Sequence, residues 1–442
     1  MRKKTVLIVD AGGRGSVLVH TYAKSPWVGK IIAVPGNDLM KSLTKKTVEI
    51  HTHLKTTSIE EIIAICKKEK VDLVDVAQDN AVAAGLVDEL KKNNFLVLGP
   101  TKNAGQIEWD KAWAREFMKK YNLPIPHYKV CFSEEEGLNF LETQPDKKWF
   151  IKAYGLLEGK GVLPAESTDE AKQKVKEMKK FGEAGKIFLI EEGLEGEEFS
   201  AFAICSGTDF ILAGFAQDHK RINNHDEGEN TGGMGCVSQP LLITNNVINQ
   251  VKSIFKITLL GLQEKERPYT GVLYLGGMLV KNKVYIIEFN ARWGDPEPQA
   301  ILPGILNDWY AINESAALGK LSKVKITFDR KVRVAIAASS RGYPIDYSQV
   351  KGKEIYGIDE VQKMKNVIFF PANIKKVGKK NTVNGGRLLY VVGEGKNIID
   401  ARKTAYAALS HVSIQGNNIH YRTDIGWRDV EKLRSKKIIY GT

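Results

Sequence analysis

The sequence predicts a multidomain protein of the α/β and α+β classes with a doubly wound parallel sheet at its N-terminus. The chain has 442 residues, more than one hydrophobic core usually organises. Over residues 1–104, short apolar runs alternate with segments of helical spacing, the pattern of a parallel sheet covered by helices. Longer strand-like runs follow, and the last hundred or so residues mix strands and helices. We expect domains over 1–104, 105–330 and 331–442, with a small lid subdomain at about 125–192.

Composition and charge argue against several classes of protein. The chain is 43% hydrophobic and 26% charged, as folded soluble proteins usually are. No apolar run approaches the roughly 20 residues of a membrane helix, and Asp10 interrupts the first one. The net charge of +13 is spread among 52 acidic residues without a basic arm or zinc finger. We therefore expect a cytoplasmic monomer that binds small molecules and neither nucleic acid nor membrane.

The first unit is expected to contain parallel strands joined by helices. A glycine-rich turn, Gly12-Gly13-Arg14-Gly15, connects the first strand to the first helix. Amide groups of such a turn can bind a phosphate, although a tight turn without a ligand explains the glycines equally well. The expected strands are 6–9, 31–34, 73–76 and 95–98, and the expected helices are 16–22, 57–68 and 81–92.

The second unit begins with a helix over 109–120 and a lid that carries a lysine inside a strand. Lys152 lies in the apolar run 150–153, just before three glycines in seven residues, the last two in Gly159-Lys160-Gly161. Glycines let backbone amides approach phosphate oxygens closely, so the segment fits a phosphate site with a mobile cover. A hairpin turn would explain the glycines but not a lysine within an apolar strand.

Two acidic stretches suit nucleotide and metal binding. Glu191-Glu192-Gly193-Leu194 ends the strand 187–191, where a backbone could pair with an adenine edge and Glu198 could accept ribose hydroxyls; an ordinary acidic linker is the alternative. Glu288 and Asn290 are two residues apart on a strand over 284–289 and its end, so their oxygens share a face and suit Mg²⁺. Arg292 continues that face and could stabilise the charge of a moving phosphate.

A polar loop region completes the candidate chemistry. The segment 217–221 contains Asp218, His219 and Lys220, and glycines crowd the segment 229–235. His219 invites a role as a base, but a phosphate-binding or structural histidine is at least as good an interpretation. Phosphate-facing lysines, a glycine cover and oxygen ligands are what ATP-dependent activation of a carboxylate requires.

Together these motifs resemble the phosphoribosylamine–glycine ligase family of ATP-grasp enzymes, and the resemblance runs nearly end to end. The matching motifs keep a common order over some 400 residues. They are Gly99-Pro100-Thr101-Lys102, Lys152-Ala153 with Gly159-Lys160-Gly161-Val162, Glu191-Glu192 with Gly196-Glu197-Glu198, Gln217-Asp218-His219-Lys220-Arg221, Asn230-Thr231-Gly232-Gly233-Met234-Gly235, Gly271-Val272-Leu273-Tyr274, Glu288-Phe289-Asn290 with Gly294-Asp295-Pro296-Glu297, Gly342-Tyr343-Pro344, Asn384-Gly385-Gly386-Arg387 and Asp424-Ile425-Gly426-Trp427-Arg428.

The resemblance implies an ATP-grasp core and an amide-forming reaction between glycine and 5-phosphoribosylamine, with ATP as a substrate and Mg²⁺ or Mn²⁺ as the metal. It implies Glu288 and Asn290 as metal ligands and Arg292, Lys220 and Asp218 as catalytic residues. The implied ATP contacts are Lys111, Lys152, Gly159, Lys160, Gly161, Glu191, Glu192, Leu194 and Glu198. The implied substrate contacts are Gly13, Arg14, Gly15, Asp79, His219, Asn230, Thr231, Gly232, Gly233, Asp295 and Arg387.

Three segments depart from the family pattern. Gly15-Ser16-Val17 replace Glu-His-Ala, Ala77-Gln78-Asp79 replace Gly-Pro-Glu, and Tyr154 stands where an aspartate is common. The first two lie on the expected amine side, so they mark either a subfamily that holds phosphoribosylamine differently or a ligase for another amine or amino acid. A nucleotide-binding regulator without catalysis is the third interpretation, which the presence of Lys152, Glu288, Asn290 and Arg292 disfavours.

Overall fold

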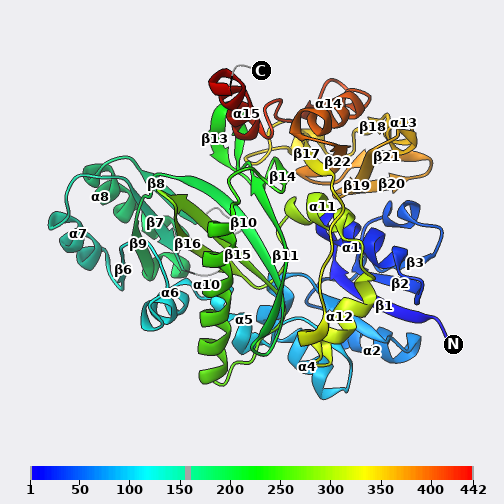
Figure 1. Cartoon of the computed structure of the whole chain (residues 1–442), viewed down its shortest axis with the longest axis horizontal. Helices are drawn as coiled ribbons and strands as arrows, with labels where there is room; N and C mark the ends of the chain where they lie inside the picture. The colour runs from blue at the N-terminus through cyan, green and yellow to red at the C-terminus, as the bar shows by residue number, and fades with distance from the viewer. Residues whose placement is uncertain (1, 155–160, 441–442) are drawn as a thin grey trace.

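The N-terminal unit is a parallel sheet with helices on both faces, as the alternating pattern predicted. The computed structural model describes residues 2–154 and 161–440. The sheet has the order β3-β2-β1-β4-β5 (Figure 1), and apolar residues of β1 are fully buried. Its strands are β1 Lys4–Asp10, β2 Val28–Pro35, β3 Thr47–Ile50, β4 Leu73–Val76 and β5 Val97–Leu98; its helices are α1 Gly13–Lys24, α2 Ile59–Glu69, α3 Asp79–Ala84 and α4 Leu86–Lys92.

Two details of this unit differ from the sequence prediction. The edge strand β3 was not expected, because its residues alternate in polarity and only Val48 among them is buried. The expected single helix over 81–92 is two helices, because Gly85 adopts a left-handed conformation with φ of 91° that ends α3. In the next unit, the helix expected over 109–120 is α6 Lys111–Lys120, whose N-cap Asp110 accepts the Trp113 amide, and an unexpected helix, α5 Lys102–Trp109, precedes it.

The lid subdomain is a small sheet packed against short helices, and it projects from the body of the molecule (Figure 1). Its strands have the order β6-β9-β7-β8. Buried side chains such as Trp149 and Phe188 form its own hydrophobic core. Its elements are β6 Tyr128–Cys131, α7 Glu134–Glu142, β7 Trp149–Ala153, β8 Val162–Ala165, α8 Thr168–Glu177, α9 Glu183–Lys186 and β9 Phe188–Glu192.

A large antiparallel sheet joins the middle of the chain to its C-terminal part. It has the order β16-β15-β10-β11-β14-β17-β22-β19, with β24 beside β17. Strands β14 and β17 pair directly, so the proposed boundary at residue 331 falls within one continuous sheet. The strands are β10 Glu197–Ser206, β11 Asp209–Asp218, β14 Gly235–Ser238, β15 Thr270–Val280, β16 Lys283–Asn290, β17 Val332–Ser340, β19 Val367–Pro371, β22 Arg387–Gly395 and β24 Ile419–His420.

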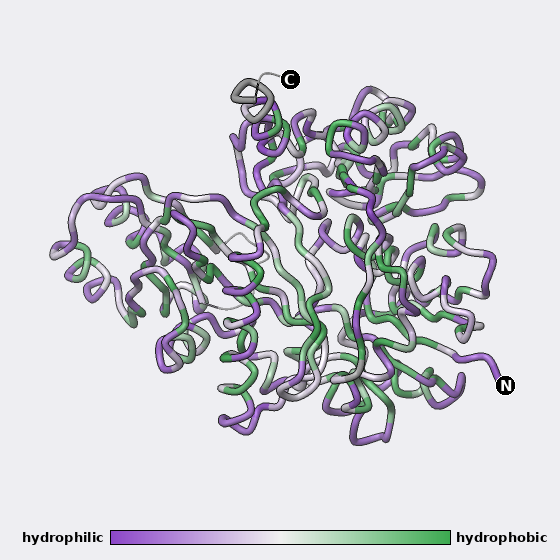
Figure 2. The backbone as a smooth tube through the Cα atoms, in the orientation of Figure 1, coloured by the Kyte–Doolittle hydropathy of each residue, from purple (hydrophilic) through white to green (hydrophobic). Residues whose placement is uncertain are grey.

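Helices and smaller sheets complete the fold. The twenty-residue helix α10 packs its apolar face on β10, β15 and β16. Figure 2 shows the central strands as largely hydrophobic and many outer segments as hydrophilic. None of the described helices is long and apolar enough to cross a membrane. The remaining elements are β12 Arg221–Asn223, β13 Glu227–Asn230, α10 Asn245–Glu264, α11 Glu297–Ile301, α12 Trp309–Ala317, β18 Glu354–Tyr356, α13 Ile358–Lys363, β20 Ile374–Val377, β21 Lys380–Val383, α14 Ile398–Leu409, β23 Ser413–Ile414 and α15 Trp427–Tyr440.

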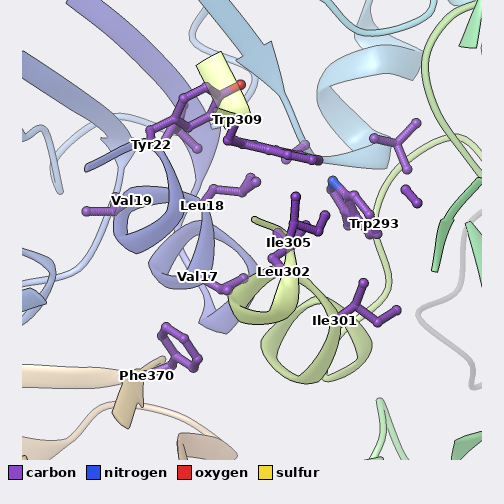
Figure 3. Packing of buried hydrophobic residues seen from close by; sticks show 14 of the residues in the cluster. Val17, Leu18, Val19, Tyr22, Trp293, Ile301, Leu302, Ile305, Trp309 and Phe370 are labelled. Carbon is purple, nitrogen blue, oxygen red and sulfur yellow. The ribbon is translucent and has the colours of Figure 1, made fainter. Parts of the chain in front are cut away.

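One hydrophobic core connects the N-terminal sheet, the central sheet and the C-terminal part. Figure 3 shows side chains of α1, including Leu18, facing Leu302 and Trp293, with Phe370 of β19 nearby. Trp293 directly follows Arg292 and packs against Trp309 at a ring-centroid distance of 6.0 Å. Because burial of large aromatic side chains contributes strongly to stability, this core fixes the chain immediately after β16. The fold class is thus confirmed.

Candidate active site

A buried ion pair lies on the lid surface that faces the central sheet. Strands β7 and β9 are antiparallel neighbours, with Lys152 opposite Leu189 and Phe150 opposite Glu191. The Lys152 Nζ atom contacts the Glu191 carboxylate, and both side chains are almost inaccessible. Because a buried ammonium needs an anion beside it, the pair explains how the apolar strand tolerates a lysine.

Arg115, which the sequence analysis missed, connects this pair to the central sheet. From α6, its guanidinium donates to the Glu191 Oε1 atom at 2.5 Å and to the carbonyl oxygen of Ile287 on β16 at 2.5 Å. Burial alone would raise the pKa of Glu191, but Arg115 and Lys152 together hold it at about 2. Glu191 is therefore a carboxylate at neutral pH. The only signal for Arg115 was its place on the apolar side of a helix.

Lys111 brings a second cation from the core to the lid. It is the first residue of α6, and its Nζ atom lies 3.4 Å from the carbonyl oxygen of Ala153 at the end of β7. Burial lowers the pKa of Lys111, while the nearby carboxylate of Glu288 acts in the opposite direction. Two lysines from different subdomains thus lie near the end of β7. Of the glycine cover, Gly161 accepts the Ala153 amide at 2.8 Å, whereas Gly159 and Lys160 lie outside the described residues.

An opposite-charge pair marks the next part of the site, on the central sheet. The Lys220 Nζ atom lies 2.7 Å from the Glu198 Oε2 atom, and both side chains are partly exposed. They border a small hollow at the start of β10, which Asp218, Gly276 and Ile287 also line. Burial and the carboxylate of Glu297 raise the pKa of Asp218. The site therefore offers cationic and anionic groups within one small recess.

The expected metal ligands lie in a row along β16. Glu288 pairs with Gly276 of β15, and Asn290 pairs with Tyr274. The Asn290 Nδ2 atom lies 3.5 Å from the Glu288 Oε1 atom, and Arg292 donates to the Asn290 Oδ1 atom at 3.3 Å. Burial would raise the pKa of Glu288, but Lys220 and the two lysines described above lower it overall. Ionised carboxylate and amide oxygens on one face are suitable donors for a hard divalent cation.

The carboxylate of Asp10 is hydrogen-bonded within the N-terminal glycine turn. The Asp10 Oδ1 atom accepts the amides of Gly12 and Gly15 at 2.6 and 2.8 Å. Its Oδ2 atom accepts from Arg14 at 3.1 Å and from Gln78 at 2.7 Å. Arg14 also donates to the carbonyl oxygen of Gly294, which ties the turn to the central domain. The Asp10 carboxylate therefore already accepts hydrogen bonds from two of the backbone amides that were expected to bind a phosphate.

A tightly bonded loop lies between the central sheet and the C-terminal part. Arg387 donates to the carbonyl oxygens of Gly232 and Asp295 at 2.5 and 2.6 Å, and it contacts the Asp295 carboxylate at 3.2 Å. The Thr231 hydroxyl donates to the carbonyl oxygen of Lys220 at 2.8 Å. This arrangement brings the segment that starts at Asn230, together with Gly233, beside the chain that follows β16.

His219 has both ring nitrogens engaged by backbone groups. Its Nε2 atom accepts the Gly426 amide at 3.0 Å, so its Nδ1 atom carries the proton and donates to the carbonyl oxygen of Gly235 at 3.2 Å. Burial, with smaller contributions from Arg422 and Arg428, lowers the pKa of His219 to about 3. This geometry favours a neutral structural histidine over a substrate contact or a base.

The remaining expected nucleotide contacts follow β9. Glu192 forms an ion pair with Lys147 at 3.1 Å, and its amide donates to the carbonyl oxygen of His127 at 2.9 Å. Leu194 is half-buried in the segment that leads to β10. Asp79 lies at the start of α3, with its carboxylate 3.9 Å from the Arg292 guanidinium.

Comparisons with known proteins agree on one family. Models of the N domain, the ATP-grasp (A) domain and the C domain of phosphoribosylglycinamide synthetase match residues 4–108, 109–298 and 333–428. A phosphoribosylamine–glycine ligase of Caldanaerobacter subterraneus subsp. tengcongensis is 35% identical over 95% of this chain and 99% of its own length.

Two further relatives place this match in context. The trifunctional purine biosynthetic protein adenosine-3 of Bos taurus is 36% identical over 98% of this chain, but the chain spans only 42% of that protein's length. The crystal structure of phosphoribosylamine–glycine ligase from Thermotoga maritima superimposes with a TM-score of 0.80 at 29% identity, over 95% of this chain and 100% of that one.

Proposed function

The chain belongs to the phosphoribosylglycinamide synthetase family, and from this premise we propose that it joins glycine to 5-phosphoribosylamine at the expense of ATP. The products are glycinamide ribonucleotide, ADP and phosphate. The observation that carries the proposal is the convergence of Lys111 and Lys152 with the Glu288–Asn290 row. Cations and oxygen ligands gathered between a lid and a sheet are what transfer of a γ-phosphoryl group to a carboxylate needs.

In the first step, a carboxylate oxygen of glycine attacks the γ-phosphorus of ATP. The bond between that phosphorus and the bridging oxygen breaks, and its electrons remain on ADP. Lys111 and Lys152 neutralise phosphate charge during this transfer, because both ammonium groups lie close enough to Glu288 to lower the pKa of that carboxyl. Arg115 supports them by donating to Glu191, the carboxylate that also contacts Lys152.

The divalent cation supplies charge neutralisation at the phosphates when it is bound. Glu288 and Asn290 fit such an ion because they present an ionised carboxylate and an amide oxygen on one strand face, and the neighbour of Glu288 on β15 is a glycine, Gly276. Mg²⁺ commonly uses one or two protein ligands together with phosphate oxygens and water. We propose Mg²⁺, with Mn²⁺ as the alternative ion of similar preference.

In the second step, the amine attacks the carbonyl carbon of the glycyl phosphate. The carbon–oxygen bond to phosphate breaks, inorganic phosphate leaves, and the amine loses a proton. We propose that Arg292 and Lys220 stabilise the departing phosphate and that Asp218 orients the reactants near Lys220. Glu198 is freed to accept ribose hydroxyls when Lys220 turns from it towards the transferred group.

The amine substrate is proposed to bind between the N-terminal turn and the Arg387 loop. This region is bordered by Gly13, Arg14, Asp79 and the segment 230–233. Asp295 lies at its base. Because Asp10 occupies two amides of the turn, the phosphate of the ribosyl group has to use other donors. The second candidate function is ligation of glycine to a different amine. The hydrogen bonds between Asp10 and the amides of the glycine turn favour it.

We also propose that the protein acts as a cytoplasmic monomer. Its four cysteines are buried and unpaired, which suits a reducing compartment. Sedimentation equilibrium at micromolar concentration would test the assembly state, and a mass near twice 49.2 kDa would contradict it.

Release of ADP tests the proposed reaction. The purified protein is assayed with Mg-ATP, glycine and freshly prepared phosphoribosylamine, and each substrate is omitted in turn. We expect ADP only with the complete mixture, together with a new ribonucleotide that contains one glycine. ADP release that persists with glycine but needs a different amine would support the second candidate instead.

A further inference from the structure

Arg292 is held in one orientation by several partners. Its Nη2 atom lies 2.9 Å from the Glu108 Oε1 atom, and its Nη1 atom donates to the carbonyl oxygen of Trp293 at 3.2 Å. The Asn290 Oδ1 atom accepts from the same guanidinium at 3.3 Å. An arginine on a flexible stem loses considerable rotamer entropy in such a position, so the surroundings specify where its charge lies.

Glu108 is the partner that connects this guanidinium to the backbone. It belongs to the last turn of α5, and its carboxylate is 6% exposed. Its Oε2 atom accepts the Ala291 amide at 2.8 Å, while its other oxygen faces Arg292. One carboxylate therefore fixes both the chain direction after β16 and the side chain of the next residue.

Packing alone gives little reason for a carboxylate at this position. Burial raises the pKa of Glu108 to about 7, and Arg292 opposes that rise. Asp79 of α3 faces the same guanidinium, and the charge of Arg14 on α1 lowers the pKa of Glu108. Replacing a buried ion pair by apolar side chains is often neutral or stabilising, so stability alone does not account for a carboxylate at this position.

We infer that Glu108 is a positioning residue that aims the Arg292 guanidinium at the phosphate transferred during ligation. The inference rests on the proposed function, because it assumes that Arg292 stabilises that phosphate. A glutamine at position 108 could still accept the Ala291 amide, yet it would not attract the guanidinium by charge. The chain would keep its path while Arg292 lost its fixed direction.

A double-mutant cycle separates positioning from a structural role. E108Q should lower kcat about 10- to 100-fold and leave KM for ATP within about twofold, because small misplacement of a catalytic group costs on that scale. R292K should be slower still, and the double variant E108Q/R292K should match R292K, since Glu108 would then have no guanidinium to aim. If the double variant instead loses kcat by the product of the two single losses, the two residues act independently and the inference is overturned.

E394Q provides a matched control at a buried ion pair far along the chain. Glu394 contacts Arg333, whose side chain is 2% exposed, in the C-terminal part of the central sheet. We expect E394Q to lower the melting temperature as much as E108Q or more, with kcat unchanged. If E394Q and E108Q reduce kcat alike, the effect of E108Q is one of stability and the inference fails.

Crystal structures of the wild type and E108Q test the inference apart from the reaction. We expect the Arg292 guanidinium to leave its place beside position 108 in the variant, while the Ala291 backbone remains within coordinate error. An unmoved guanidinium would refute the inference even if the wild type proves to be the proposed ligase. A wild type that releases no ADP with the complete substrate mixture would refute the proposed function, whatever the guanidinium does.

Discussion

Replacing Lys152 with methionine removes one cation from the site and keeps a side chain of similar length. Glu191 retains Arg115 at 2.5 Å, so its carboxylate is not left unpaired. The stability loss should therefore stay near the cost of one charged hydrogen bond, about 1.5–3 kcal/mol. A cation that stabilises charge only as phosphate moves is worth more in the reaction. Loss of one preorganised donor of that kind costs about 2.7–4 kcal/mol, or roughly 100- to 1,000-fold in kcat.

The assay is ADP release at saturating substrates, combined with a thermal unfolding curve for each protein. Lys148→Met is the matched control, because Lys148 is on the same lid and pairs with the exposed Glu166 at 2.7 Å. A surface pair of this kind contributes about 0–1 kcal/mol, so the control should unfold and turn over nearly as the wild type does. Lys152→Met with kcat within about threefold of the control would refute the assignment of Lys152 to the phosphates.

Three further substitutions probe the metal, a buried histidine and the domain junction. Glu288→Gln removes the charged member of the two proposed protein ligands, so half-maximal activity should need at least about tenfold more Mg²⁺. A titration at fixed ATP measures this requirement, and an unchanged value would contradict the assignment of Glu288 to the metal. His219 has a pKa of about 3 when folded and an ordinary value of 6.5, so only the unfolded chain gains its proton between those values. The free energy of unfolding should thus fall as pH drops below 6.5, by about 2 kcal/mol at pH 5. Urea unfolding of His219→Gln should not show this part of the pH-dependent loss. If the free energy of unfolding has the same pH dependence in the wild type and the variant, His219 is not a buried neutral ring. Gly13→Ala would place a Cβ atom 2.1 Å from the Tyr390 ring, so it should destabilise the fold by about 1–3 kcal/mol in urea, whereas Gly12→Ala, with no atom nearer than 3.6 Å, should not.

The sequence was sufficient to predict features that depend on local pattern. Apolar runs identified β1 and β4, and the spacing of Glu288 and Asn290 placed both side chains on one strand face. The break at Gly85 was missed, because a helical pattern of apolar residues continues through it. The periodicity of apolar residues indicates which face of a helix or strand is buried, but it is a poor indicator of where the element ends.

The partners of the site residues could not be predicted from the sequence. Glu108 and Arg115 come from two short helices, and each contacts a residue more than seventy positions away. In the sequence, Glu108 resembles an ordinary charged residue of a helix surface, and only the place of Arg115 on the apolar side of its helix indicates burial. Asp10 is similar, because only the structure shows that its carboxylate occupies the amides of the glycine turn. The continuous sheet across residue 331 likewise follows from strand pairing rather than from composition.

Oxygen transfer from glycine to phosphate tests the central claim most directly. The reaction is run with glycine labelled by ¹⁸O at both carboxylate oxygens, and the released inorganic phosphate is analysed by mass spectrometry. If a glycyl phosphate forms, one ¹⁸O atom passes to phosphate in each turnover and the other remains in the amide product. Phosphate that is released without ¹⁸O while the amide accumulates would contradict activation of the carboxylate by phosphorylation.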